Sequence, residues 1–282
     1  MFLKYRTQGL IFKKEERGEA DQLFTVFTRD FGKLEVLGKA IRKISSKLGS
    51  GIEIFYLSEI EFIQGKIYKT LTDAFLIEKF QNLRKDLERL DIAYKISEDL
   101  DNFVKGEEPD EKIWQLILET FEKLNNPNLQ SSITERLSEG REEGIFFDFN
   151  LQYYYFFWNF ISILGYKPEL YFCLICRKKL KPEKLYFSSK EGGIICQDCS
   201  KSFGVPSGSG IETKQEVVKI LRKILEKDWK ILSRLRNIKE YLKSIETISK
   251  NYSAFICRVA WQRGERRSDS FFELEKRNDN MN

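Results

Sequence analysis

The spacing of the cysteines constrains this chain of 282 residues more than any other feature of its sequence. Four of the five cysteines form two Cys-x2-Cys pairs separated by 19 residues, namely Cys173, Cys176, Cys196 and Cys199. Each pair can form a tight turn whose thiolates bind one metal ion, and two pairs supply the four sulfur ligands of a structural Zn²⁺ site. The sequence therefore predicts one structural zinc ion in a module at about residues 170–203. Two disulfides or four free thiols are the alternatives.

The chain contains no histidine. Catalysis by a serine or cysteine nucleophile with an imidazole base is therefore excluded, as is an imidazole proton shuttle at neutral pH. Four sulfur ligands leave no open position for a metal-bound water, so we expect no enzymatic role for the zinc. The fifth cysteine, Cys257, lies in an apolar stretch where a buried thiol is expected.

Several features indicate a cytoplasmic protein. The first residues lack the apolar stretch and cleavage site of a signal peptide, and cysteines with zinc-site spacing fit a reducing compartment. The richest apolar run, residues 153–164, is shorter than the 18 or so residues that a membrane span requires. We expect no membrane association.

Charge is distributed unevenly along the chain. The formal net charge of +5 is composed of +3 over residues 1–80, −8 over residues 81–150 and +10 over residues 151–282. Such asymmetry favours a polyanionic partner on the basic surfaces, although ordinary surface ion pairing remains an alternative.

The first eighty residues are expected to form short strands separated by turns. The expected strands are residues 9–13, 22–28, 33–37, 53–57 with 60–63, and 67–77. About five strands in this length suit a small closed barrel, because closure removes exposed sheet edges. We therefore predict an OB-fold barrel over residues 1–79.

One part of this module is strongly basic. Between residues 33 and 49 the cations are opposed only by Glu35, and they are Lys33, Lys39, Arg42, Lys43 and Lys47. Cations on such an excursion are suited to the phosphates of nucleic acid, whose neutralisation releases condensed counterions. Arg6 and Arg29 could widen the surface. A solvated charge run with no ligand is the alternative.

Residues 80–282 are expected to form a mainly α-helical domain that carries the zinc module. Apolar residues recur with a helical period over residues 83–94 and 113–124, and again over residues 231–245. The aromatic run Tyr153–Trp158 reads as a buried central helix rather than a base-stacking platform, since exposing so many rings would forfeit much burial.

Acidic residues between the first two helical stretches raise the possibility of a carboxylate metal site. They are Asp99, Asp101, Glu107, Glu108 and Asp110. A flexible acidic turn explains them better than a metal-dependent nuclease.

Basic residues also surround the zinc cysteines, namely Arg177, Lys178, Lys179, Lys181 and Lys184. They suit either a second phosphate contact or the neutralisation of a tetrathiolate zinc site, whose formal charge is about −2.

Several sequence stretches resemble the RecO family of bacterial recombination mediators. In the first module they are residues 5–12 (YRTQGLIF), 18–33 (GEADQLFTVFTRDFGK), 38–43 (GKAIRK), 46–49 (SKLG) and 70–74 (TLTDA), which leads into 80–87 (FQNLRKDL). A second match is residues 160–168 (FISILGYKP), followed by Cys173 to Cys176. The resemblance covers about residues 1–200, and its motifs occur in the family's order.

This resemblance implies a DNA repair and recombination protein that is not an enzyme. Members of the family bind single- and double-stranded DNA, anneal complementary strands, and associate with RecR. They also help to load RecA onto strands coated by single-strand-binding protein, whose C-terminal tail is a further expected partner. Transferred to this chain, the DNA contacts are the basic positions of the matching stretch, with Arg6 and Arg29 less secure. DNA binding would place the cytoplasmic protein at the nucleoid. The alternative is a scaffold whose OB domain mainly docks RecR.

The C-terminal part carries two further predictions. Residues 205–210 are expected to be a flexible joint, because a Ser-Gly-Ser-Gly string lacks the features of a phosphate-binding loop. The cluster Arg263, Arg266 and Arg267 suits a basic tail or a disordered end.

Overall fold

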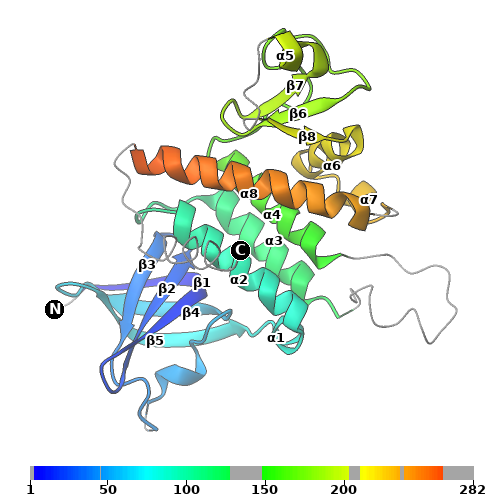
Figure 1. Ribbon diagram of the computed structural model, residues 1–282. Coiled ribbons are helices and arrows are strands. Elements are labelled where there is room, and N and C mark those ends of the chain that lie inside the picture. The colour runs from blue at the N-terminus through cyan, green and yellow to red at the C-terminus, as the bar shows by residue number, and fades with distance from the viewer. Residues whose placement is uncertain (1–2, 45, 128–147, 203–209, 236–237, 263–282) are drawn as a thin grey trace, which may run out of the picture. The chain divides into compact units, whose positions relative to one another are not determined.

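A computed structural model describes residues 3–44, 46–127, 148–202, 210–235 and 238–262 (Figure 1). The chain divides into two compact units, one formed by Met1–Gly165 with Lys223–Glu240 and the other by Tyr166–Arg222 with Tyr241–Asn282. The expected division into residues 1–79 and 80–282 stays a prediction. Most of the joint at residues 205–210 and the cluster Arg263, Arg266 and Arg267 lie outside the described residues.

The first unit begins with a closed barrel of five strands. They are β1 (Lys4–Arg17), β2 (Asp21–Thr28), β3 (Gly32–Gly38), β4 (Leu57–Ile63) and β5 (Lys69–Glu78). The strands are hydrogen-bonded in the closed order β1-β2-β3-β5-β4. All neighbours are antiparallel except β3 and β5, which pair in parallel. The predicted OB-type barrel is confirmed.

Alternation along the strands fills the barrel interior. On β4, Ser58, Ile60 and Phe62 are buried while the residues between them are partly exposed, as the two-residue period of a strand requires. The interior also includes Leu34 and Val36 of β3, both fully buried. Burying a side chain of this kind contributes roughly 1.5–3 kcal/mol, so the apolar interior holds the strands in register.

One expected strand is absent. Residues 53–56 form a loop, and β4 begins only at Leu57. The reason lies at Phe55, whose backbone has a φ of 62° and whose side chain is fully buried. Its ring centroid lies 4.9 Å from that of Tyr94 and 5.9 Å from that of Phe121. Packing against the helices overrides the strand preference of this aromatic segment.

The remainder of the first unit is helical. Its main helices are α1 (Gln81–Lys85), α2 (Leu87–Phe103), α3 (Glu111–Asn125), α4 (Phe149–Ile163) and α7 (Trp229–Leu232). Aspartates precede α2, α3 and α4, and each side chain accepts hydrogen bonds from N–H groups of the first turn: Asp86, Asp110 and Asp148. These caps satisfy donors that a helix N-terminus leaves unpaired, so they explain where each helix begins.

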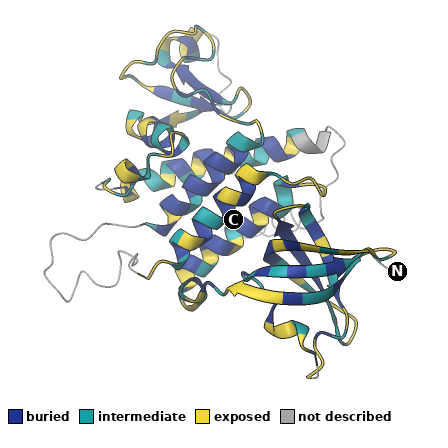
Figure 2. Ribbon diagram, turned by 180° about the vertical axis from the view of Figure 1, so that it is seen from behind, coloured by how far each residue is buried: buried dark blue, intermediate teal, exposed yellow. Residues whose placement is uncertain are grey.

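Helix α4 is the core of this unit, as predicted from its aromatic run. Every side chain from Tyr154 to Ile161 is buried (Figure 2). Two amide side chains of this helix, Gln152 and Asn159, are also buried, and the Asn159 amide donates to the carbonyl oxygens of Tyr155 and Ile224. Among the described helices, none is both long and apolar enough to cross a lipid bilayer.

The second unit contains a small sheet and further helices. The strands β6 (Leu185–Ser188), β7 (Gly193–Cys196) and β8 (Gly210–Thr213) pair in the order β7-β6-β8. The helices α5 (Gln197–Ser202), α6 (Gln215–Leu225) and α8 (Lys239–Gln262) follow β7 and β8 along the chain, and the end of α6 and first residues of α8 belong to the first unit. The prediction of one continuous helix over residues 231–245 is wrong, because α7 ends at Leu232 and α8 begins at Lys239.

The expected flexible acidic turn is also wrong for Asp99 and Asp101, which both belong to α2. The Asp99 side chain is buried, accepts a hydrogen bond from Tyr153 of α4, and leaves its Oδ2 atom without a partner. Burial, assisted by the nearby Glu98 carboxylate, outweighs that hydrogen bond and raises the pKa of Asp99 to about 8. The folded protein therefore favours the protonated carboxyl at neutral pH.

The substitution Asp99→Asn should change how stability depends on pH. Because its pKa is raised in the folded state, Asp99 binds more protons there than in the unfolded chain from about pH 4 to about pH 8. Its contribution to the unfolding free energy therefore falls as pH rises through this range. The unfolding free energy of Asp99→Asn minus that of wild type should increase by more than about 1 kcal/mol between pH 5 and pH 8. Denaturant titrations at the two pH values measure this difference.

Asp91→Asn is the matched control, because Asp91 is exposed on the same helix and pairs with Lys95 four residues away. If the unfolding free energies of Asp99→Asn and wild type changed equally with pH, a buried neutral carboxyl at Asp99 would be contradicted.

Candidate nucleic-acid interface and metal centre

The predicted basic excursion is the connection between β3 and β4, and residues 39–47 are called the basic loop below. Barrel contacts fix its path. Ile41 is buried in the barrel core. The N–H of Ala40 donates to the Asp21 carboxylate at 2.7 Å, and the N–H of Arg42 donates to the Ala20 carbonyl at 3.0 Å. An apolar anchor and two hydrogen bonds thus hold the loop against the β1–β2 turn.

The loop presents its lysines to solvent. Lys39, Lys43 and Lys47 are all exposed, and none of the three forms an ion pair within the described parts of the chain. Arg42 lies 3.2 Å from Glu16, but the two side chains are 41% and 69% exposed, so this pair is worth little and can exchange for a phosphate. The structure therefore brings four of the seven predicted DNA contacts together on one loop.

Two other predicted contacts lie elsewhere and have carboxylate partners. Arg6 of β1 pairs with Glu59 of β4 and lies 5.5 Å above the ring of Phe75. Arg29, in the turn between β2 and β3, lies 3.8 Å from Glu111 of α3. Both side chains remain more than half exposed, so these pairs leave the cations accessible.

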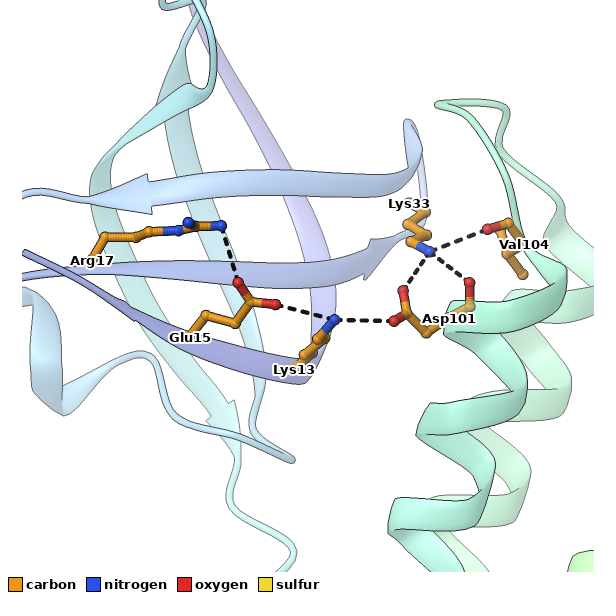
Figure 3. Close-up of polar contacts among 6 residues, drawn as sticks. All are labelled: Lys13, Glu15, Arg17, Lys33, Asp101 and Val104. Carbon is orange, nitrogen blue, oxygen red and sulfur yellow. Dashed lines mark hydrogen bonds and ion pairs between the residues drawn. The ribbon is translucent and has the colours of Figure 1, made fainter. Parts of the chain in front are cut away.

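The seventh predicted contact, Lys33, is enclosed (Figure 3). Its ammonium donates to Asp101 Oδ1 at 2.7 Å, to the Asp101 carbonyl at 3.0 Å and to the Val104 carbonyl at 3.3 Å. Only 17% of the side chain is exposed. All three ammonium protons therefore have acceptors at the C-terminal end of α2, where a cation also complements the helix dipole.

Asp101 is the centre of a charged network that joins β1, β3 and α2. Its other oxygen, Oδ2, accepts from Lys13 at 3.1 Å, and Lys13 in turn pairs with Glu15, which pairs with Arg17 (Figure 3). Burial alone would raise the pKa of Asp101, but Lys33 and Lys13 outweigh it and lower that pKa. The carboxylate is thus ionised at neutral pH and fastens the barrel to the helix.

The four predicted metal ligands converge at one point in the second unit. Their Sγ atoms all lie within 4.8 Å of one another, and those of Cys176 and Cys196 are 3.9 Å apart. Four sulfurs at the usual Zn–S distance of about 2.3 Å would lie about 3.8 Å from one another in a tetrahedron. The described residues contain no other group of three or more cysteine or carboxylate side chains with metal-binding geometry.

The electrostatics of the cluster suit a cation. Burial raises the pKa of Cys173, but N–H groups of Cys196, Cys176 and Ile175 outweigh it and lower that pKa to about 7. Burial and the neighbouring sulfurs raise the pKa of Cys199 to about 12. One thiolate thus forms readily while further deprotonation is opposed, and a bound divalent cation would remove that opposition.

Comparison with known proteins identifies the family. Residues 1–80 match the family described as "Recombination protein O N terminal", and residues 148–255 match "Recombination protein O C terminal". The chain belongs to the RecO family. The resemblance recognised in the sequence motifs is thereby confirmed.

Curated RecO relatives extend over most of the chain. The chain is 32% identical over 242 residues to "DNA repair protein RecO" of Dehalococcoides mccartyi strain ATCC BAA-2266, with 86% of each chain covered. It is 30% identical over 202 residues to the protein of that name from Caldanaerobacter subterraneus, with 71% of this chain and 72% of the relative covered. For Roseiflexus sp. strain RS-1 the identity is 27% over 278 residues, with 89% and 91% covered.

The RecO matches can be placed on the structure. The N-terminal match contains the whole barrel and the basic loop, and the C-terminal match begins with the cap of α4 and includes all four clustered cysteines. Residues 81–147, which include α2 and α3, lie between the two matched regions. Sequence reasoning missed two exposed aromatic residues beside the RecO cysteine cluster, Tyr171 and Phe172. Their position directly before Cys173 was the available signal.

Lys33→Ala should destabilise the first unit. Removing this ammonium takes the Lys33 donor from Asp101 Oδ1 and from two carbonyl groups in a partly buried place, and leaves Lys13 as the remaining lysine partner of Asp101, at a cost of about 1–3 kcal/mol. The matched control Lys39→Ala should change the unfolding free energy by no more than about 0.5 kcal/mol. Equal midpoints for the two variants in urea titrations would show that the Lys33 contacts contribute nothing to stability.

The cysteine cluster should bind about one zinc ion per chain. Cys176→Ser should lower the zinc content measured by mass spectrometry and make residues 170–202 the first sites of tryptic cleavage, because metal binding and folding of such modules are coupled. Cys257→Ala, which removes the cysteine outside the cluster, should keep its zinc. Zinc-free protein with two disulfides would overturn this assignment.

Proposed function

We propose that this protein is a DNA-binding mediator of recombinational DNA repair that uses no bond-making chemistry. The observation that carries the proposal is the basic loop, whose backbone the barrel fixes while Lys39, Lys43 and Lys47 remain exposed and without ion pairs in the described structure. Membership of a family whose relatives are named as DNA repair proteins supports DNA as the ligand of this surface.

The proposed mechanism is neutralisation of phosphate charge. Cations that replace condensed counterions bind DNA with little sequence preference, and they reduce the repulsion that keeps two complementary strands apart. Single- and double-stranded DNA both present such phosphates. A basic loop together with the net charge of +10 over residues 151–282 would allow two strands to be held together for annealing.

The contacts differ in the support that they have. Lys39, Lys43 and Lys47 are the leading DNA contacts, and Arg42 joins them if it exchanges Glu16 for a phosphate. Arg6 and Arg29 remain proposed contacts at the periphery. Lys33 is the least supported, because its ammonium is occupied by α2.

The remaining parts of the proposal follow from the family. RecR, the C-terminal tail of single-strand-binding protein and, indirectly, RecA are the proposed protein partners, and the protein would act in the cytoplasm at the nucleoid. One structural zinc ion would hold the cysteine module in shape. The acidic side chains of a nuclease are not assembled, since Asp99 is buried, Asp101 pairs with lysines, and Glu107 pairs with Lys69 of β5.

One observation favours a second candidate, a scaffold whose barrel mainly docks RecR. Strand β5 exposes three successive apolar side chains, Phe75, Leu76 and Ile77, with Glu59 paired opposite Phe75 on β4. Apolar exposure on a sheet is typical of protein interfaces rather than of phosphate contacts. In this case DNA would bind chiefly to the complex.

Reversing the charge of the exposed lysines should weaken DNA binding. Lys39→Glu, Lys43→Glu and Lys47→Glu combined should lower the affinity for a labelled oligonucleotide at least tenfold at 50 mM salt, about equally for different sequences. Fewer phosphate contacts should also make the plot of log affinity against log salt less steep. Fluorescence anisotropy across 50–250 mM salt measures both effects.

Lys95→Glu and Lys250→Glu combined are the control, since both lysines are exposed on helices away from the basic loop in sequence. Wild-type binding that did not respond to salt would contradict the proposal. The scaffold candidate would replace the proposal if wild type bound DNA only after RecR was added and Phe75→Glu abolished this RecR-dependent binding.

A further inference from the structure

Two aromatic side chains project from the start of the first cysteine turn. Tyr171 and Phe172 precede Cys173 directly, and their side chains are 42% and 46% exposed. A structural zinc module has no need of exposed rings, because burying them would stabilise the fold. Their exposure therefore calls for a ligand that covers aromatic faces.

Side-chain hydrogen bonds hold this pair in a fixed conformation. Glu169 Oε1 accepts from the N–H of Tyr171 at 2.7 Å and from the N–H of Phe172 at 3.2 Å. Glu169 itself is fastened to β7, because its carbonyl accepts from Ile194 N–H and its N–H donates to the Gly192 carbonyl. The backbone that carries the aromatic pair is thus held in place before any ligand arrives, which reduces the entropy cost of binding.

The two rings differ in their surroundings. The guanidinium of Arg222, from α6, lies 4.6 Å from the centroid of the Tyr171 ring, and its Nε–H donates to the Leu170 carbonyl at 2.9 Å. One face of Tyr171 is therefore supported by a cation. Within the described structure, no ring stacks on Phe172, which leaves it the more open of the two.

Cations border the rings. Phe172 and Lys179 are bridge partners across the turn, and the N–H of Cys173 donates to the Lys178 carbonyl at 2.9 Å. From residue 171 to residue 190 the chain has six basic residues against one acidic residue, Glu183. Of these cations Lys184 pairs with Glu212, whereas Lys178, Lys179 and Lys181 are exposed and form no ion pair in the described structure.

Neutralisation of the metal cluster does not account for this arrangement. Cations that merely offset a tetrathiolate charge could occur without exposed rings beside them. Exposed aromatic faces bordered by exposed lysines are instead the combination that binds unpaired nucleotides, with bases stacking on the rings and phosphates pairing with the ammonium groups.

We propose that residues 171–181, called the aromatic turn, form a second DNA site that takes one or two unpaired bases of single-stranded DNA. Phe172 supplies the stacking face, Tyr171 widens it, and Lys178 and Lys179 contact the flanking phosphates. The inference rests on the proposed DNA-binding function and adds to it a site that distinguishes unpaired from paired bases.

Selectivity for unpaired bases separates this site from phosphate binding alone. A base inside a duplex already has both faces stacked, so it cannot stack on Phe172 without leaving the helix. Phosphates are present in both forms of DNA. Loss of the ring should therefore affect single strands much more than duplexes, whereas loss of the lysines should affect both.

The experiment uses the full chain and a labelled oligo(dT) or a duplex of equal length. Phe172→Ala should weaken oligo(dT) binding about fivefold or more, the low end of what one stacked base supplies, and should change duplex binding less than twofold. Lys178→Ser with Lys179→Ser should weaken both. Leu87→Ala, which removes a side chain that is 83% exposed on α2, is the matched control and should change neither.

A second variant gives a direct signal and guards against misfolding. Phe172→Trp should keep wild-type affinity and zinc content, and oligo(dT) should quench its added fluorescence, whereas Leu87→Trp should show no added quenching. This site would be overturned if wild type bound oligo(dT) while Phe172→Trp showed no added quenching and Phe172→Ala kept its affinity. The proposed function would then remain intact. Wild-type protein that binds no DNA would overturn both.

Discussion

Closure of the barrel is the constraint on which the rest of the first unit depends. Because β3 pairs with β5 in parallel, β4 must lie on the far side of β5, where it pairs with β1. The chain that leaves β3 must therefore cross the barrel end before it can enter β4. That crossing is the connection that carries the basic loop, and Ile41 inserts into the core on the way. Closure thus requires a connection outside the strands, and the lysines of this connection are exposed.

The network around Asp101 shows how much a cation's role depends on what faces it. Lys33 and Lys39 stand at opposite ends of the β3 segment, six residues apart. Near Lys33 the chain meets the end of α2, where carbonyl groups and a carboxylate need donors. Near Lys39 it turns toward solvent. The same residue type therefore fastens the barrel at one end and remains available to a polyanion at the other, so net charge alone overstates the surface that DNA can use.

Local patterns made much of this structure predictable from sequence. The cysteine spacing located the metal cluster, the alternation of apolar residues and turns indicated the barrel, and the aromatic run identified α4 as the core. What the sequence did not show concerns contacts between distant residues. Lys33 and Asp101 are 68 positions apart, and neither has a local signal that announces the other. Phe55 has a strand-like neighbourhood, but it packs on rings of α2 and α3. Asp99 lies in an acidic stretch typical of a solvated turn, but in the folded protein it is buried and accepts a hydrogen bond from Tyr153. Tertiary packing decides such cases, and periodicity does not encode it.

A site that stacks unpaired bases must also release them if strands are to anneal, and the magnitudes allow this. A base held on an exposed ring is stabilised by about 1–3 kcal/mol. Each step of a growing duplex gains about 1.4 kcal/mol on average, so a tract of roughly ten steps gains far more than one or two stacked bases lose. Pairing would therefore draw bases off Phe172, while phosphate contacts at the basic loop would persist because a duplex keeps its charge. On this proposal, stacking would restrain a single strand until its complement arrives, and base pairing would then release the bases without any chemical step.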